Sequence, residues 1–136
     1  MTTNDVKVIL YKIVNASALG SIPIYRDVHP PIKSSKEATE RIVINCLGLN
    51  NAPWKKGYAN VNIFVPYLKE AESDQPDVNR LSALETIATD LFKSIYDETK
   101  GACLIRTEEI KQEEDKPTWS YFINVRLKIQ VSNFKL

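Results

Sequence analysis

The sequence predicts an α+β fold, a two-layer sandwich in which two helices cover one face of a mainly antiparallel sheet of about five strands. Residues 118–133 alternate apolar and polar side chains, which indicates a strand with one dry face. Two other segments repeat apolar residues at helical spacing. Loops rather than crossover helices join neighbouring strands, which favours antiparallel pairing. The predicted order is α-β-β-β-α-β-β, in a single domain over residues 1–136.

The N-terminal elements are a helix and a short strand. Residues 4–17 predict the helix, with Thr3 or Asn4 as its N-cap. One helical face collects its apolar residues, Val6, Ile9, Leu10, Ile13 and Val14. Residues 22–27 predict a strand whose proline favours a sheet edge. The loop 29–39 carries too few apolar residues to pack well, so we expect it to be mobile.

The second and third strands are predicted over ERIVINCLGL (40–49) and YANVNIFVPY (58–67), with only seven to nine paired residues each. In the second of these segments, Asn60 and Asn62 share a face. Asparagine is a poor strand residue, so this face is expected to be wet or functional.

The longest helix is predicted over residues 77–98, about 20 residues in all. Residues 102–112 then predict a fourth strand. Its apolar residues change phase between Ile105 and Ile110, which indicates a β-bulge.

The last two strands form a predicted hairpin, residues 102–131, that is longer than the strands beside it. Its tip should therefore project more than about 10 Å beyond the sheet. Trp119 and Tyr121 lie on this arm, where exposed aromatics need a partner surface. That partner is either a loop of the same chain, 29–39 or 66–77, or another subunit.

Composition places the chain among ordinary globular proteins, with 43% hydrophobic and 26% charged residues and a net charge of +1. No apolar run approaches the roughly 20 residues that span a bilayer, and the N-terminus does not resemble a signal peptide. We therefore expect a protein kept in the cytoplasm, with no membrane partner. Cys46 and Cys103 are expected to be buried thiols.

Catalytic chemistry has little support in the sequence. His29 is the only histidine and lies in a loop, and no glycine-rich phosphate loop is present. Glu108 and Glu109 are adjacent on a strand and so point to opposite faces. The cluster at 113–115 lies at a hairpin tip, where charges are normally solvated. We predict no enzyme activity, no catalytic residue, no metal site and no cofactor.

A second class of function is a small module that binds single-stranded nucleic acid. Trp54, Lys55 and Lys56 lie together in a loop, and the wet face of the last strand carries Phe122, Arg126 and Lys128. Aromatics among cations suit base stacking, although the neutral net charge does not favour nucleic acid. This remains the alternative hypothesis.

The whole arrangement resembles the tail-completion or tail-terminator proteins of tailed bacteriophages and prophages, which join the tail tube to the head. The resemblance covers nearly the whole chain and rests on an N-terminal helix followed by six segments: IPIYRDVHP, ERIVINCLGL, YANVNIFVPY, RLSALETIATDLFKSIYDE, and LIRTEEI with TWSYFINVRLKIQV as the closing hairpin. It contains no diagnostic motif, and the 66–77 linker has no counterpart in the family.

The resemblance implies a structural protein without activity or cofactor that forms a homo-oligomeric ring, commonly a hexamer, between the tail tube protein and the head connector protein. It implies assembly in the cytoplasm of the bacterial host and a final place in the virion tail. The residues expected at subunit contacts are Trp54, Lys55, Lys56, Asn60, Asn62, Glu113, Glu114, Trp119, Tyr121 and Arg126.

Overall fold

Two α-helices and one sheet form the described part of the chain. The computed structural model describes residues 1–50, 54–69 and 74–132. The α-helices are α1 (Thr3–Asn15) and α2 (Val78–Leu91). The strands are β1 (Ile24–Arg26), β2 (Arg41–Leu49), β3 (Trp54–Pro66), β4 (Ile95–Asp97), β5 (Cys103–Asp115) and β6 (Ser120–Ser132). Short 3-10 helices are η1 (Ala18–Ser21), η2 (Ser35–Glu37) and η3 (Lys116–Thr118).

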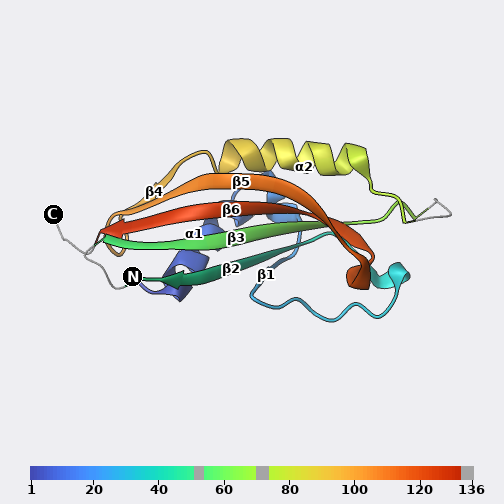
Figure 1. Cartoon of the computed structure of the whole chain (residues 1–136), viewed down its shortest axis with the longest axis horizontal. Coiled ribbons are helices and arrows are strands. Elements are labelled where there is room, and N and C mark those ends of the chain that lie inside the picture. The colour runs from blue at the N-terminus through green and yellow to red at the C-terminus, as the bar shows by residue number, and fades with distance from the viewer. Residues whose placement is uncertain (51–53, 70–73, 133–136) are drawn as a thin grey trace.

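The strands form one sheet in the order β1-β2-β3-β6-β5-β4 (Figure 1). The predicted α+β class is confirmed, but the sheet has six strands rather than about five, and it is mixed. β1 runs parallel to β2, with Ile24 opposite Ile42. Parallel neighbours need a long connection, and residues 27–40 supply one. Part of the predicted linker, residues 70–73, lies outside the described residues.

The longest helix is shorter than predicted, because α2 ends at Leu91 and the following residues form β4. Phe92 is fully buried at the helix end, and its carbonyl accepts hydrogen bonds from the backbone N–H and the hydroxyl of Thr107. Ile95 then pairs with Ile105 on β5. Ile95 matched the apolar period of the helix, but its side chain contacts the core equally well from a strand.

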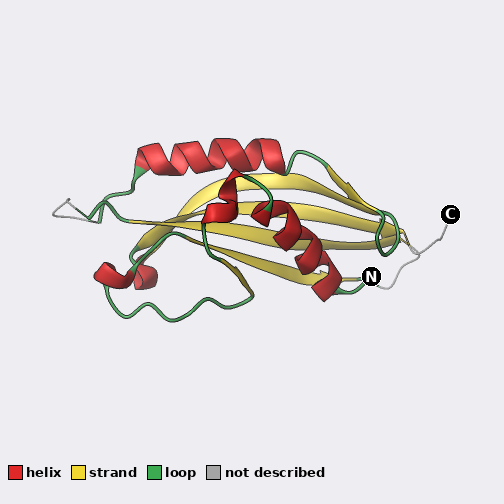
Figure 2. Ribbon diagram, turned by 180° about the vertical axis from the view of Figure 1, so that it is seen from behind, coloured by secondary structure: helices red, strands yellow, loops and turns green. Residues whose placement is uncertain are grey.

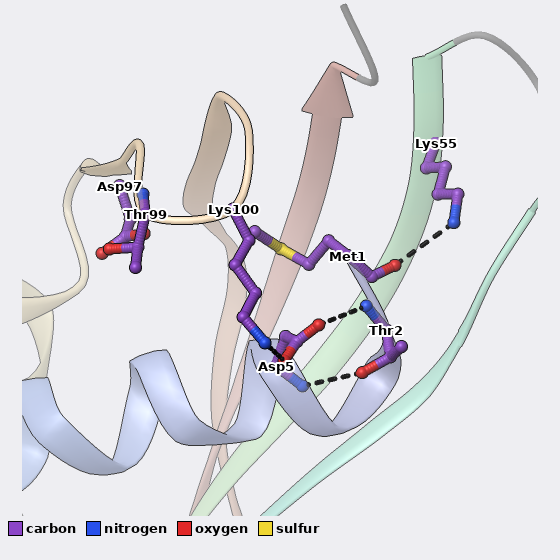
Figure 3. A network of polar contacts seen from close by, with 7 residues as sticks. All are labelled: Met1, Thr2, Asp5, Lys55, Asp97, Thr99 and Lys100. Carbon is purple, nitrogen blue, oxygen red and sulfur yellow. Dashed lines mark hydrogen bonds and ion pairs between the residues drawn. The ribbon is translucent and has the colours of Figure 1, made fainter. Parts of the chain in front are cut away.

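The N-terminal helix begins one or two residues earlier than the sequence indicated. Thr2 is the N-cap, and it forms a reciprocal capping box with Asp5, with hydrogen bonds of 3.1 Å and 2.8 Å (Figure 3). The Lys100 ammonium lies 3.0 Å from the Asp5 carboxylate. The backbone N–H of Thr2 and then Lys100 lower the pKa of Asp5 to about 2.

The core lies between the helices and one face of the sheet (Figure 2). α1 packs against β2, and α2 packs over β3 and β6. Alternate residues of β3 and β6 face the helices and are fully buried: Ala59, Val61, Ile63, Ile123, Val125, Leu127, Ile129 and Val131. Each such aliphatic side chain contributes about 1.5–3 kcal/mol when buried. Cys103 joins this core and burial raises its pKa to about 11, whereas Cys46 is only half-buried.

The projecting hairpin predicted from the sequence is wrong. β3 pairs with β6 along its whole length, from Trp54 opposite Ser132 to Pro66 opposite Ser120. β3, β5 and β6 therefore run side by side for similar lengths (Figure 1). In the sequence, residues 54–57 (Trp-Lys-Lys-Gly) suggested a loop. In the structure they pair with β6 and form the first part of β3. The predicted bulge in the fourth strand is confirmed, between Thr107 and Glu109.

The aromatics near the hairpin tip are partly covered by the same chain. Trp119 follows η3 with a positive φ of 50° and is half-buried. Its carbonyl accepts a hydrogen bond from the N–H of Tyr67, 3.0 Å away. The Tyr67 ring meets the Tyr121 ring edge-on at 5.7 Å. The residue directly after β3 thus provides part of the partner surface that these aromatics need.

Candidate functional site

The face of the sheet opposite α1 and α2 is called here the open face. It carries the alternate residues of β3 and β6 that do not enter the core: Lys56, Tyr58, Asn60, Asn62, Phe64, Phe122, Asn124, Arg126, Lys128 and Gln130. Residues of β2 and β5 in register with these extend the same face.

The centre of the open face is a network of four half-buried asparagines. The register places Asn45 opposite Asn60 and Asn62 opposite Asn124. Asn60 donates to Asn45 at 3.2 Å, and Asn124 donates to Asn60 at 3.2 Å and to Asn62 at 2.7 Å. Three strands are thereby joined through side-chain amides, which orders this polar surface. The sequence suggested Asn60 and Asn62 but not the two residues that complete the network.

An aromatic cluster lies beside this network, toward the hairpin tip. The rings of Phe64 and Phe122 stack at 5.0 Å, and the ring of His29 lies 5.8 Å from Phe64. The guanidinium of Arg41 lies 4.2 Å from the centre of the Phe64 ring. Phe64 is only 8% exposed, so the loop that carries His29 covers this part of the open face. The 3-10 helix η2, which belongs to the same loop, lies beside η3 of the hairpin turn (Figures 1 and 2).

Arg41 is a buried cation that the sequence did not single out. Its side chain donates one hydrogen bond, from Nη1 to the carbonyl of Thr39 at 3.1 Å. Its Nε and Nη2 atoms are buried and have no acceptor among the described residues. Burial lowers the pKa of Arg41, and the nearby charges of Asp115 and Tyr25 oppose that shift. Burying a guanidinium in this way lowers the stability of the folded protein.

The opposite end of the open face is basic. Lys56, Arg106 and Lys128 are called here the basic end; Arg106 lies directly opposite Lys128 across β5 and β6. Among the described residues none of the three forms an ion pair. Lys56 and Lys128 border a hollow of about 380 Å³, which is also lined by Leu47, Asn50 and Tyr58.

Two glycines shape that hollow. Gly48 has a φ of +124°, and the β2–β3 register shifts between Cys46 and Leu49. A Cβ on Gly57 would lie 2.0 Å from the Gly48 carbonyl oxygen, so no other residue fits there without a backbone shift. Asn50 and Lys56 close the hollow by exchanging hydrogen bonds of 3.0 and 3.1 Å. The hollow is therefore preformed.

The second half of β5 is acidic and uncovered. β4 pairs with β5 only over Cys103 to Ile105, so the outer edge of residues 108–115 carries no strand in the described structure. Four carboxylates there are called the acidic end: Glu109, Glu113, Glu114 and Asp115. Glu113 lies 3.0 Å from Lys111, and Glu114 accepts a 2.7 Å hydrogen bond from the Tyr67 hydroxyl. Burial and then Glu114 raise the pKa of Tyr67.

Arg126 separates the two ends. Its guanidinium lies 4.4 Å from the centre of the Tyr58 ring, and its Nε donates to Glu108 at 3.1 Å. Both interactions are internal to the chain, so Arg126 already has partners.

The structure does not bring the predicted contact residues into one cluster. Trp54, Lys56, Asn60, Asn62, Glu113 and Arg126 lie on the open face, and Trp54 is 55% exposed. Lys55, Glu114 and Tyr121 lie on the helix side, where Lys55 donates to the Met1 carbonyl at 3.2 Å (Figure 3). Trp119 lies at the turn. Sequence reasoning missed Tyr58, Arg106 and Arg41, whose significance depends on which strands are neighbours.

The sequence matches no protein-family model and no curated protein. Among the helices of the described residues, none is long and apolar enough to cross a membrane. No group of three or more His, Cys, Asp or Glu side chains in residues 1–50, 54–69 and 74–132 could hold a metal ion.

Proposed function

We propose that this chain is a structural protein of a phage or prophage tail, which forms a ring at the end of the tail tube and joins or terminates the tail. The proposal of this family comes from the order of helices and strands, which resembles that of tail-completion and tail-terminator proteins. Its partners would be further copies of itself, the tail tube protein and the head connector protein. It would assemble in the cytoplasm of the bacterial host and remain in the virion tail.

The observation that carries this proposal is the uncovered part of the sheet. The half of the open face around Tyr58 has no covering layer among the described residues, and no described strand pairs with the outer edge of residues 108–115, where Gln112 donates to Glu85 of α2 at 3.4 Å. One end is basic, with Lys56, Arg106 and Lys128, and the other is acidic. Like charges oppose pairing between identical ends, whereas opposite charges favour head-to-tail contacts. Repeated head-to-tail contacts that close on themselves make rings.

Light scattering after size exclusion, with negative-stain images of the purified full chain, tests this proposal. We expect closed rings of identical copies, either alone or on addition of isolated tail tubes, which the rings should cap. A chain that stays monomeric at every concentration and never adds to tubes would contradict it.

Binding of single-stranded nucleic acid is the second candidate, favoured by Trp54 and Tyr58 beside the basic end. Against it, Phe122 already stacks on Phe64, and Arg126 already stacks on Tyr58. Titration of tryptophan fluorescence with an oligonucleotide at low salt separates the two candidates. Saturable quenching without rings would support nucleic-acid binding, whereas no quenching at low salt would remove it.

A further inference from the structure

We propose that the hollow at the basic end receives the acidic end of a second copy of this chain, so that each subunit contacts the next head to tail. This inference rests on the proposed ring and names the contact that would build it.

The first argument is that the hollow is ready for an acidic partner. Gly48 and Gly57 fix the backbone that bounds it, which limits the rearrangement that binding requires. Lys56 and Lys128 contribute ammonium groups that have no carboxylate partner among the described residues. Leu47, which is 62% exposed, adds an apolar contact. With about 380 Å³, the hollow lies near the small end of ligand sites, which suits a few side chains rather than a large ligand.

The second argument is that the complementary surface belongs to the same chain. The acidic end lies on β5 beyond the point where β4 stops pairing, so its outer edge is open. Glu109 and Glu113 are exposed there, on the open face, with Lys111 between them and 3.0 Å from Glu113. The three cations of the basic end would then face the four carboxylates of the acidic end. A contact between two basic ends would oppose three cations to three cations, which excludes that symmetric arrangement.

Nucleic acid fits this surface less well. A phosphate chain that left the hollow along β5 and β6 would meet the exposed carboxylates of Glu109 and Glu113. Those carboxylates repel phosphate, whereas in the head-to-tail arrangement they belong to the contact with the next subunit.

Charge reversal in the full chain tests the contact. The basic variant is K56E with K128E, and the acidic variant is E109K with E113K. A control, K12E with K93E, changes the charge equally at two exposed lysines on the helix side. Sedimentation velocity measures the ring fraction, and circular dichroism checks that each variant is folded. We expect each test variant alone to raise the dissociation constant at least tenfold, and the control to match the wild type.

An equal mixture of the two test variants is the decisive sample. Each reversed end then faces an oppositely charged end on the other variant, so rings of alternating subunits should return. If both variants form rings alone as well as the wild type does, or if the folded mixture fails to restore rings, the inference is wrong while the ring proposal stands. If the wild type forms no ring, the proposed function itself fails. Loss of oligonucleotide binding by K56E/K128E with rings intact would instead assign the hollow to nucleic acid.

Discussion

The two faces of the β3–β6 strand pair are made by the same residues in alternation, yet they are stabilised in different ways. On the helix side, Val61 meets Val125 and Ile63 meets Ile123, all fully buried. On the open face, Asn62 meets Asn124, which donates hydrogen bonds to Asn62 and to Asn60. The helix side stabilises through burial, and the open face through polar contacts that water can partly replace. The first face should determine the fold, and the second should be free to change for binding.

Truncation of two neighbouring residues of β6, one on each face, tests this difference most directly. Leu127→Ala should lower the free energy of unfolding by about 2–5 kcal/mol, because it leaves a cavity in the core. Arg126→Ala, on the open face, should cost no more than about 1 kcal/mol, since its ion pair is exposed. Urea denaturation followed by tryptophan fluorescence measures both. Equal losses would mean that the open face also supports the fold.

Gly57→Ala should cost somewhat less, about 1–3 kcal/mol, because the added Cβ would press on the Gly48 carbonyl. Gly48→Ala is the matched control, since a Cβ there meets nothing within 4 Å and only the positive φ opposes it. Thermal unfolding should rank the wild type above Gly48→Ala and Gly48→Ala above Gly57→Ala. A fully stable Gly57→Ala protein would show that the bulge beside the hollow adapts readily.

The asparagine network should contribute less to the free energy of unfolding than the core around Leu127 or the bulge beside Gly57. Asn124→Ala removes the donor shared by Asn60 and Asn62, and should lower the free energy of unfolding by about 1 kcal/mol. Gln130→Ala, farther along β6 on the same face, is the control and should change stability by less than about 0.5 kcal/mol. Urea denaturation compares them. A loss above about 2 kcal/mol, which is roughly twice the contribution of a single hydrogen bond, would indicate a cooperative network.

Much of the fold could be predicted from the sequence because strand and helix periods are local signals. The alternation in residues 118–133 predicted β6, and the phase change near Ile110 predicted the bulge. Strand lengths depend on pairing, so β3 was predicted too short and the projecting hairpin followed from that error. β4 was missed because Ile95 and its neighbours fit a helical period equally well.

The candidate site was less predictable because it depends on neighbours across the sheet. Asn60 and Asn62 stood out as poor strand residues, but nothing local connects them to Asn124, 62 residues away from Asn62 in the chain. Arg106 and Lys128 become one basic surface only through the register of β5 with β6. Such pairs could not be predicted before the strand order was known.

Substitution of Arg41 should have the smallest effect on stability among these test variants. It also tests the difference between the two faces, because Arg41 is a polar residue that is buried on the open face. Arg41→Met removes a guanidinium with two unpaired nitrogens, together with one hydrogen bond and the contact with Phe64. The stability lost with these contacts and the stability gained by removing the buried charge should nearly cancel. The free energy of unfolding should therefore change by no more than about 1 kcal/mol in either direction. Arg80→Met, which breaks the ion pair with Glu40, is the control and should cost up to about 1 kcal/mol. A loss above about 2 kcal/mol for Arg41→Met, measured by urea denaturation, would mean that Arg41 has an acceptor in solution. Asp115, whose charge opposes the lowering of the Arg41 pKa by burial, would be the next residue to substitute.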